Sequence, residues 1–403
     1  MSPRDGYAGE WPDILGPTRS GIASSDEVLS DTWPPDGPPV LWQRTVGQGY
    51  AGIVVSGGIG FLFHRLANQE ILEAFDPVSG KEIWSDQHTT TFRPQVGSGD
   101  GPLCTPCVDG KYIITYGAQG ILACHNIHSG NLLWQRDTHT DFDAREGYFG
   151  AGSSPIVIDD IVVVNVGGAK KDAGIVGFEM TTGKTMWSTT AQPASYSSPT
   201  RVKIGKTTYA LIITRYKCLL LDPHSGEMQW EFSFGMRGPT VNAAIPVVQK
   251  KPAGLSLLIT ASYGIGSIEG TFNQTAFMKR WESPDALASQ YCTPIVIGPH
   301  AYCIDGRDDM PPTSMKCIDT TTGVVLWNQD NFGYGTLIYA DKKIMAAKTN
   351  GELVLMQATP QHFNVLGQHR VLNGTLRALP ALANGKLFLR DETTLVCLSV
   401  GRQ

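Results

Sequence analysis

Apolar residues in this chain form short runs that are bounded by turn residues. Residues 156–158 and 161–164 are two such runs, and a pair of aspartates separates them. Runs of this length are typical of β-strands, in which side chains alternate between the two faces of a sheet. They are far shorter than the ~20 apolar residues that a membrane-spanning helix requires. The pattern predicts an all-β chain without a membrane span.

One eleven-residue pattern recurs along the chain. It consists of a small residue, a variable residue, Asp, Asn or Glu, two variable residues, Ser or Thr, Gly, three variable residues and Trp. Copies end at Trp84, Trp134, Trp187, Trp230 and Trp327, a degenerate copy ends at Trp281, and Trp42 ends a copy whose front half is missing. Asp or Asn four residues before Gly suits a tight turn, because the side chain bonds nearby backbone N–H groups and Gly readily adopts positive φ. Each copy therefore predicts a β-hairpin whose second strand ends in Trp, and we interpret the tryptophans as packing residues between repeats.

The spacing of the tryptophans predicts the architecture. Successive copies end 42 to 53 residues apart, which is room for four short strands and their turns, the size of a propeller blade. A second signal, a proline before the innermost strand, alternates with the hairpin. These prolines are Pro106, Pro155, Pro199, Pro246, Pro294 and Pro380.

The two ends of the chain complete the ring. The 76 residues after Trp327 hold one whole blade and three strands of another, and residues 40–43 supply the missing fourth strand. This pairing leaves no open sheet edge. The predicted fold class is all-β, an eight-bladed β-propeller of four-stranded antiparallel blades, with residues 40–403 as a single propeller domain. Residues 1–39, which include four prolines between positions 34 and 39, are expected to form an extended lead-in strap.

Composition and charge narrow the class of partner. The 403 residues include 45 Gly and 25 Pro, which argues against a helical bundle, and the net charge is −5 without a run of five like charges. Neither nucleic acid nor an anionic membrane is therefore an expected partner. The first eleven residues lack the apolar segment of a signal peptide. The localisation stays open: the chain as written is cytoplasmic, or it begins after processing of an exported protein.

The hairpin-plus-Trp repeat resembles the quinoprotein repeat of the pyrroloquinoline-quinone-type propellers. More specifically, the chain is similar to bacterial quinoprotein-like propeller repeat proteins, which are related in fold to the eight-bladed outer-membrane assembly lipoprotein. The closer likeness is carried by residues 11–21 (WPDILGPTRSG), 351–360 (GELVLMQATP) and 395–399 (LVCLS). The resemblance implies a periplasmic location for an exported form. It does not imply one function, because the family includes quinone-dependent alcohol dehydrogenases as well as a non-catalytic assembly scaffold.

The resemblance also implies what a quinone-dependent dehydrogenase carries: an adjacent Cys-Cys disulfide, a Trp under the cofactor, a calcium ion on Glu, Asn and Asp, and a catalytic Asp. This chain has no adjacent Cys pair, and Cys104 and Cys107 lack the following His of a haem attachment site. Asp305, Asp308 and Asp309 form its densest carboxylate cluster, which suits either a calcium loop or a solvated turn. We therefore assign no catalytic residue, metal ligand or required cofactor, and retain pyrroloquinoline quinone with calcium for the dehydrogenase alternative.

Candidate binding residues come from the loops that enter the innermost strands, because these loops line the mouth of a propeller channel and loops often carry function. Counting back from the blade prolines or their equivalents gives Tyr50, Tyr196, Tyr291, Tyr334 and Arg377. Further polar candidates nearby are Asp100, Asn242 and Arg215, together with Tyr148. The tyrosines either plug the channel or line a pocket for a flat or sugar-like ligand, in which Arg377 orients a carboxylate or a hydroxyl group.

The sequence therefore predicts a non-catalytic propeller scaffold that binds a small molecule, a glycan, or a peptide or protein partner on its loop face at the central channel. A loop such as residues 167–174 is a candidate for capturing an extended peptide by strand addition. The alternative is a divergent pyrroloquinoline-quinone-dependent alcohol or sugar dehydrogenase. A third hypothesis is a glycan-cleaving propeller that uses a Tyr/His or Tyr/Arg pair.

Overall fold

The hairpin predicted from the repeat forms the outer half of a blade. In the first copy, the Asp76 carboxylate accepts hydrogen bonds from the backbone N–H groups of Val78 and Ser79, at 2.7 and 3.2 Å. Gly80 closes the turn at φ +71°, a conformation that glycine adopts without strain. The flanking strands pair in antiparallel fashion. The chemistry of the turn thus sets the register of the two outer strands.

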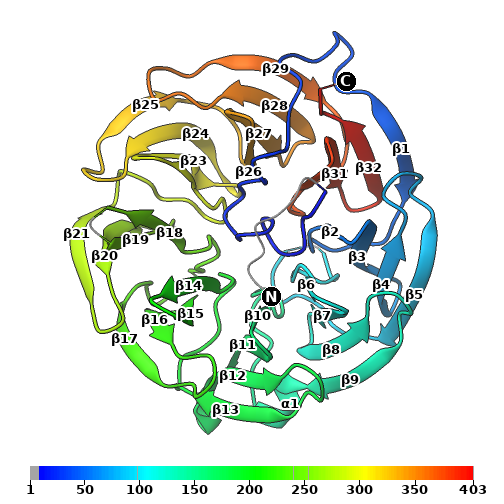
Figure 1. Cartoon of the computed structure of the whole chain (residues 1–403), viewed down its shortest axis with the longest axis vertical. Helices are drawn as coiled ribbons and strands as arrows, with labels where there is room; N and C mark the ends of the chain where they lie inside the picture. Colours follow the sequence, from blue (N-terminus) through cyan, green and yellow to red (C-terminus); the bar gives the residue numbers. More distant parts are fainter. Residues whose placement is uncertain (1–8, 98, 239, 253, 403) are drawn as a thin grey trace.

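A computed structural model describes residues 9–97, 99–238, 240–252 and 254–402, and its strands form the eight-bladed propeller that the sequence predicts (Figure 1). Each blade is a four-stranded antiparallel sheet. The first four blades consist of β2 (Val54–Ser56), β3 (Ile59–Leu66), β4 (Gln69–Phe75) and β5 (Glu82–Thr89); β6 (Cys107–Asp109), β7 (Tyr112–Tyr116), β8 (Ile121–Asn126) and β9 (Leu132–Asp137); β10 (Ile156–Ile158), β11 (Ile161–Gly168), β12 (Ala173–Glu179) and β13 (Thr185–Thr189); and β14 (Thr200–Ile204), β15 (Thr207–Ile213), β16 (Lys217–Leu221) and β17 (Met228–Ser233). The last four consist of β18 (Val247–Lys251), β19 (Gly254–Ala261), β20 (Gly266–Phe272) and β21 (Phe277–Ser283); β22 (Ile295–Ile297), β23 (His300–Arg307), β24 (Met310–Asp319) and β25 (Val325–Gln329); β26 (Gly335–Ala340), β27 (Lys343–Lys348), β28 (Glu352–Gln357) and β29 (Val365–Arg370); and β30 (Ala381–Ala383), β31 (Lys386–Arg390) and β32 (Thr394–Ser399) with β1 (Val40–Thr45).

The ring closes as predicted. Strand β1 pairs with β32 in antiparallel fashion, with Trp42 opposite Cys397 and Arg44 opposite Leu395, so the N-terminal strand is the fourth strand of the last blade. The prolines predicted to precede innermost strands stand directly before β6, β10, β14, β18, β22 and β30. Both signals from the sequence are therefore confirmed.

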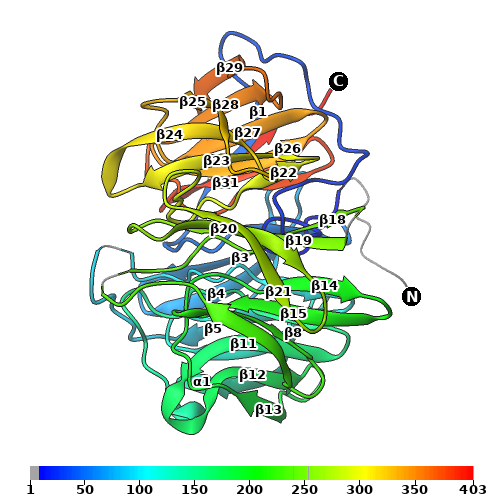
Figure 2. The same ribbon diagram turned by 90° about the vertical axis from the view of Figure 1, so that its left-hand side faces the viewer.

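The described residues include two short helices: α1 (Thr138–Phe142) between β9 and β10, and the 3-10 helix η1 (Ala169–Lys171) between β11 and β12. Within the described ranges, no helix has the length and apolar character needed to cross a membrane. We call the side of the ring that carries the blade-to-blade connections the loop face; it also carries the turns between second and third strands. Figure 2 shows the ring from the side, with α1 and the dark blue N-terminal segment toward opposite faces.

The repeat tryptophans join neighbouring blades, which confirms their predicted packing role. Their predicted place at the end of the outer strand is wrong: Trp134 is the third residue of β9, because β8 continues to pair with this strand as far as Asp137. The Trp134 indole N–H donates to the Met180 carbonyl oxygen of the next blade at 2.8 Å, and a Cβ at Gly183 would lie 2.5 Å from its ring. The equivalent indole hydrogen bonds run from Trp42 to Pro77, Trp84 to Ile127, Trp187 to Pro223, Trp230 to Asn273, Trp281 to Thr320 and Trp327 to Thr359.

The eighth interface uses a tryptophan from outside the repeat. At the repeat position of β29 the chain has Gly367, which lies opposite Leu355 as Trp134 lies opposite Cys124. The ring of Trp33 covers this glycine, where a Cβ would be 3.1 Å from the ring. The segment before β1 therefore supplies the aromatic side chain that this blade lacks.

The segment before β1 also crosses the centre of the ring (Figure 1). Trp11 bridges to Val55 of β2. The Glu27 carboxylate accepts the backbone N–H groups of Asn384 and Gly385, at 2.6 and 2.9 Å, in the turn between β30 and β31 on the side opposite the loop face. The inner strands thus hold this segment on that side, and the strap boundary at residue 39 stays a prediction.

A buried ion pair anchors the same segment near the axis. Arg19 is 2% exposed, Asp13 is 0% exposed, and Nη2 of Arg19 lies 2.6 Å from the Asp13 carboxylate. Arg19 also donates to the carbonyl oxygens of Pro155 and Pro199, which precede the first strands of the third and fourth blades. One arginine therefore links the N-terminal segment to two blades.

Candidate functional site

A cavity opens on the loop face beside the second, third and fourth blades. It has a volume of about 570 Å³ and is lined by the β9–β10 connection with α1, the β11–β12 turn with η1, the β13–β14 connection and the β15–β16 turn. Its aromatic lining consists of Tyr116, His139, Tyr148, Tyr196 and Tyr216. Pockets for small molecules have volumes of about 300–1,000 Å³ and similarly aromatic walls.

Arg215 is held firmly in the wall of this cavity. Its guanidinium carbon lies 5.9 Å from the centre of the Tyr148 ring and 5.6 Å from the centre of the Tyr216 ring. Nε donates to the Tyr216 hydroxyl at 3.1 Å, and Nη2 donates to the Gly238 carbonyl oxygen at 2.5 Å. Among the described residues, Nη1 has no hydrogen-bond acceptor and the guanidinium has no carboxylate partner. One edge of a fixed cation is thus left for a ligand.

Tyr196 fills space that a glycine leaves open. A Cβ at Gly152 would lie 2.3 Å from the Tyr196 ring, so a larger residue would clash here. The Tyr196 hydroxyl accepts a hydrogen bond from the Phe149 backbone N–H at 3.0 Å, and the two rings meet edge-on with centres 5.7 Å apart. Burial raises the pKa of Tyr196, so the phenol is neutral near pH 7 and keeps its hydrogen for donation.

Asn242 holds the backbone at both of these residues. It is buried, and its backbone carbonyl accepts the Tyr196 N–H at 2.9 Å. Its side-chain Nδ2 donates to the carbonyl oxygens of Thr214 and Arg215, at 2.9 and 3.2 Å. Three candidates that the sequence singled out, Tyr196, Arg215 and Asn242, are therefore brought together by the fold.

Two buried polar atoms of cavity-lining residues lack a hydrogen-bond partner within the described part of the chain: Oδ1 of Asn165 and Nδ1 of His139. Asn165 is 2% exposed, and its Nδ2 donates to the Ile213 carbonyl oxygen at 3.3 Å. Burial lowers the pKa of His139, so its ring is neutral near pH 7 and Nδ1 either donates or accepts. Native proteins leave few such atoms unsatisfied, since each one is costly.

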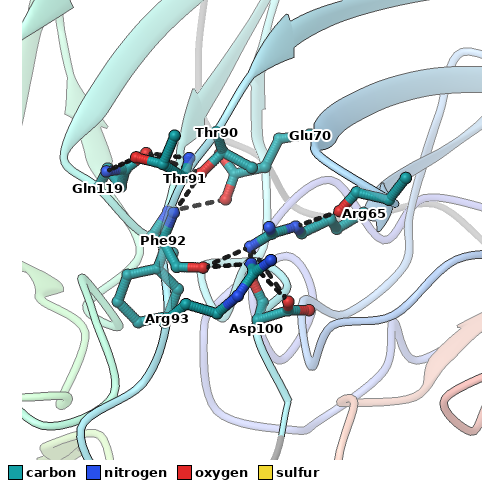
Figure 3. Close-up of polar contacts among 10 residues, drawn as sticks. Arg65, Glu70, Thr90, Thr91, Phe92, Arg93, Asp100 and Gln119 are labelled. Atoms are coloured by element: carbon teal, nitrogen blue, oxygen red, sulfur yellow. Dashed lines mark hydrogen bonds and ion pairs between the residues drawn. The ribbon is translucent and has the colours of Figure 1, made fainter.

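Asp100 lies in the loop that supports the cavity (Figure 3). Its carboxylate is 2.9 Å from Arg93 and 3.5 Å from Arg65, and its carbonyl oxygen accepts from Arg65 at 2.7 Å. The same loop reaches the cavity wall, because the Gln95 N–H donates to the Tyr148 carbonyl oxygen at 2.9 Å. Asp100 therefore does not line the cavity, although Gln95, a few residues earlier in the chain, does.

The remaining sequence candidates gather elsewhere on the loop face. The Tyr291 and Tyr334 rings meet edge-on with centres 4.6 Å apart. Arg377 donates through Nε and Nη2 to one oxygen of Asp308, at 2.9 and 2.7 Å, and lies 5.6 Å from the centre of the Tyr50 ring. Burial lowers the pKa of Arg377, but Asp308 and the nearby tyrosines outweigh this effect and raise it. The single ring of tyrosines expected from the sequence is thus divided into this cluster and the cavity of Tyr196.

Replacement of Tyr334 by Phe is expected to lower the free energy of unfolding by about 1–3 kcal/mol, because buried backbone N–H groups lose their acceptor. The Tyr334 hydroxyl accepts from Tyr291 N–H at 2.8 Å and Cys292 N–H at 3.1 Å, and it lies 3.0 Å from Ser289 Oγ. Urea denaturation measures the loss. The control is Tyr112→Phe, because the Tyr112 hydroxyl has no hydrogen bond among the described residues; equal losses in the two variants would contradict this role.

The acidic cluster does not converge on one point. Each of its three aspartates has its own cation: Asp305 with Lys316, Asp308 with Arg377 and Asp309 with Arg307. Across the described ranges, no group of three or more His, Cys, Asp or Glu is placed to hold a metal ion. The eight cysteines are buried and free. Asp308 and Asp309 form the turn between β23 and β24, whereas Asp305 lies within β23, and cations of the chain itself pair with all three carboxylates.

The sequence did not single out His139, Asn165 or Tyr216. Asn165 carried a signal, since it interrupts the apolar run at 161–166. The 167–174 loop, expected to capture a peptide, is instead largely a closed hairpin: Gly168 pairs with Ala173, and η1 forms part of the cavity wall. Strand addition is therefore not favoured there, because the hairpin already uses backbone groups of this segment.

Several solved structures share this fold. BamB from Moraxella catarrhalis has 14% sequence identity and a TM-score of 0.63, and the match covers 90% of this chain and 99% of that chain. A europium-containing methanol dehydrogenase has 10% identity and a TM-score of 0.69, covering 96% and 90% of the two chains. Quinohemoprotein alcohol dehydrogenase from Comamonas testosteroni has 14% identity and a TM-score of 0.68, covering 99% and 82%. Identities this low show a shared fold alone.

Sequence comparison gives the family. The curated proteins contain no match to this chain. Residues 67–329 match the family described as outer membrane protein assembly factor BamB. This match spans more than half of the chain, and the protein therefore belongs to the family of outer membrane protein assembly factor BamB.

Proposed function

We propose that this chain is a non-catalytic propeller that binds a ligand in the loop-face cavity. The observation that carries the proposal is the cavity of about 570 Å³, in which Arg215 is a cation fixed by its own chain. Binding sites for small molecules combine mostly apolar walls with a few fixed polar groups. Here Tyr196 and Arg215 supply such groups, and Asn242 positions both.

The proposed site lies to one side of the channel axis, beside the second, third and fourth blades. The sequence favoured the channel mouth, but Arg377 and Asp308 use their charges on each other, and the Tyr334 hydroxyl is engaged by backbone N–H groups. In the cavity, by contrast, Nη1 of Arg215 has no acceptor among the described residues. A ligand gains more binding free energy from a hydrogen-bonding group that is already held in position and has no other partner.

The family description supports binding rather than catalysis, since it names an assembly factor. We extend the proposal to a protein partner on the loop face and to an exported, periplasmic location. Cell fractionation with immunoblotting tests the location. Recovery of the intact chain from the cytosolic fraction alone would contradict it.

Filling the cavity mouth is expected to abolish ligand binding without unfolding the protein. Ala169 lines the cavity on η1, so Ala169→Trp places an indole in it. A panel of saccharides and short peptides, screened by thermal shift, is expected to contain a compound that stabilises the unsubstituted protein. At a ligand concentration of 100 times Kd, the stabilisation is about 2.7 kcal/mol. The same compound should not stabilise Ala169→Trp.

The matched control for this experiment is Lys206→Trp, in the exposed turn between β14 and β15 on the opposite face. This variant should respond to the ligand as the original protein does. Equal stabilisation of Ala169→Trp, or a panel without any stabilising compound, would contradict the proposed function.

The second candidate is a quinone-dependent dehydrogenase, which the folds of the methanol and alcohol dehydrogenases support. The residues present do not fit a quinone site with calcium: Cys104 and Cys107 are free, and each aspartate of the 305–309 cluster pairs with a cation of the chain. We therefore derive no reaction step. Dye-linked oxidation of alcohols or sugars after addition of pyrroloquinoline quinone and calcium, if it survived Ala169→Trp, would favour this candidate over binding.

A further inference from the structure

The charged residues that line the cavity are three cations, Arg145, Lys170 and Arg215, and two carboxylates, Asp143 and Glu146, so the lining has one excess positive charge. Lys170 at the rim is 2.9 Å from Asp143, so its charge is compensated. Arg215 has no such carboxylate partner among the described residues, although it is held between Tyr148 and Tyr216. A guanidinium in this position favours an anionic group of the ligand, because hydrogen bonds between ionised groups are the stronger ones.

Hydrogen-bonding groups beside Arg215 favour a ligand with hydroxyl groups. The Tyr196 hydroxyl uses its oxygen to accept from Phe149 and retains its hydrogen. The Asn165 amide is oriented by its donation to the Ile213 carbonyl oxygen, since the opposite orientation would place two oxygens together. Its Oδ1 is consequently left as a buried acceptor without a partner among the described residues, on a side chain that lines the cavity.

These groups belong to one connected network. Asn165 contacts Ile213 at the end of β15, Arg215 follows two residues later, and Asn242 ties the Arg215 turn to Tyr196. A receptor for an anion, an acceptor for a hydroxyl group and aromatic rings therefore belong to the lining of a single cavity. Aromatic rings provide an apolar surface against which a sugar ring packs.

We infer that the cavity binds an acidic carbohydrate, a sugar that carries a carboxylate, with the carboxylate on Arg215, hydroxyl groups on Asn165 and Tyr196, and the ring against the tyrosines. This inference rests on the proposed function, because it assigns a ligand class to the same cavity. An acidic peptide is a different partner, and it is an outcome of the test.

The test compares a uronic acid disaccharide with its methyl ester by isothermal titration calorimetry. The two probes share rings and hydroxyl groups and differ in the charge that Arg215 is inferred to bind. The free acid should bind more tightly than the ester by about tenfold or more, the size expected for a charge-assisted hydrogen bond. Raising the salt concentration should weaken binding of the acid more than binding of the ester.

Arg215→Gln should remove this preference for the acid, so that the acid and the ester bind this variant with similar affinities, because the charge-assisted contact is lost. Arg215→Lys should retain part of the preference for the acid, because it keeps a positive charge. Lys170→Gln is the matched control, because it removes a cation at the same cavity that already has Asp143 as its partner. Thermal unfolding shows that each variant is folded.

Equal binding of acid and ester, or an unchanged preference in Arg215→Gln, would overturn the acidic-carbohydrate inference. The proposed function would still stand if a neutral sugar or a peptide bound and Ala169→Trp abolished that binding. If no panel compound bound at all, both would fail. The two failures are therefore distinguishable.

Discussion

Replacement of Arg19 by Met is expected to lower the free energy of unfolding by about 3–5 kcal/mol, the size seen when one partner of a buried ion pair is removed. The Asp13 carboxylate, 0% exposed, would lose the cation that lies 2.6 Å away. The carbonyl oxygens of Pro155 and Pro199 would lose a donor as well. We expect a loss near the lower end of this range, because Arg201 lies 3.2 Å from Asp13 and still compensates part of the negative charge of its carboxylate. Urea denaturation at pH 7 measures the change.

A double variant separates the effect of the buried Asp13 charge on stability from the effect of the packing of the Arg19 side chain. Arg19→Met with Asp13→Asn should recover part of the stability, because the second substitution removes a buried carboxylate that Arg201 compensates only in part. Arg402→Met, which breaks an exposed pair with Asp31, should change stability little and serves as the control. If the double variant were less stable than Arg19→Met, the ion pair would not be the source of the effect.

The blade count could be predicted from sequence because each blade repeats the same local chemistry. Asp76, Gly80 and Trp84 recur with fixed spacing, and a turn and its flanking strands depend on residues that are close in the chain. Contacts between distant segments leave no such pattern. Trp33 takes the place that Gly367 leaves empty, and Arg19 reaches two blades across the axis, yet neither belongs to a repeat.

The candidate site was harder to predict for the same reason. Equivalent spacing brought Tyr50, Tyr196, Tyr291 and Tyr334 to one face, but the length and path of each connection decided where each ring points. The longest connection, between β9 and β10 with α1, lines a cavity that includes Tyr196 but none of the other three tyrosines. The other three tyrosines lie in the cluster of the Arg377–Asp308 ion pair and the Tyr291–Tyr334 contact.

Replacement of Trp134 by Ala is expected to destabilise the protein by about 3–5 kcal/mol, the usual effect of truncating a buried Trp. Trp134 is 8% exposed, donates to the Met180 carbonyl oxygen at 2.8 Å and covers Gly183 of the next blade. Trp134→Phe should cost less than Trp134→Ala, since the phenyl ring keeps part of the apolar surface, although the indole N–H and one ring are lost. Urea denaturation of both variants measures the difference, and equal losses would contradict packing between blades as the dominant contribution.

A cycle with Gly183 tests whether the ring and the glycine act as one unit. Gly183 has φ +69°, and a Cβ there would lie 2.5 Å from the Trp134 ring. Gly183→Ala alone should therefore lose stability through both backbone strain and the clash with the ring. In the Trp134→Ala background the clash is gone, and about 1 kcal/mol of backbone strain remains. The two substitutions should therefore be non-additive, with an interaction energy of about 1 kcal/mol or more. Additive losses would show that the glycine is required only for its positive φ, and that the repeat conserves turn geometry and interblade packing for separate physical reasons.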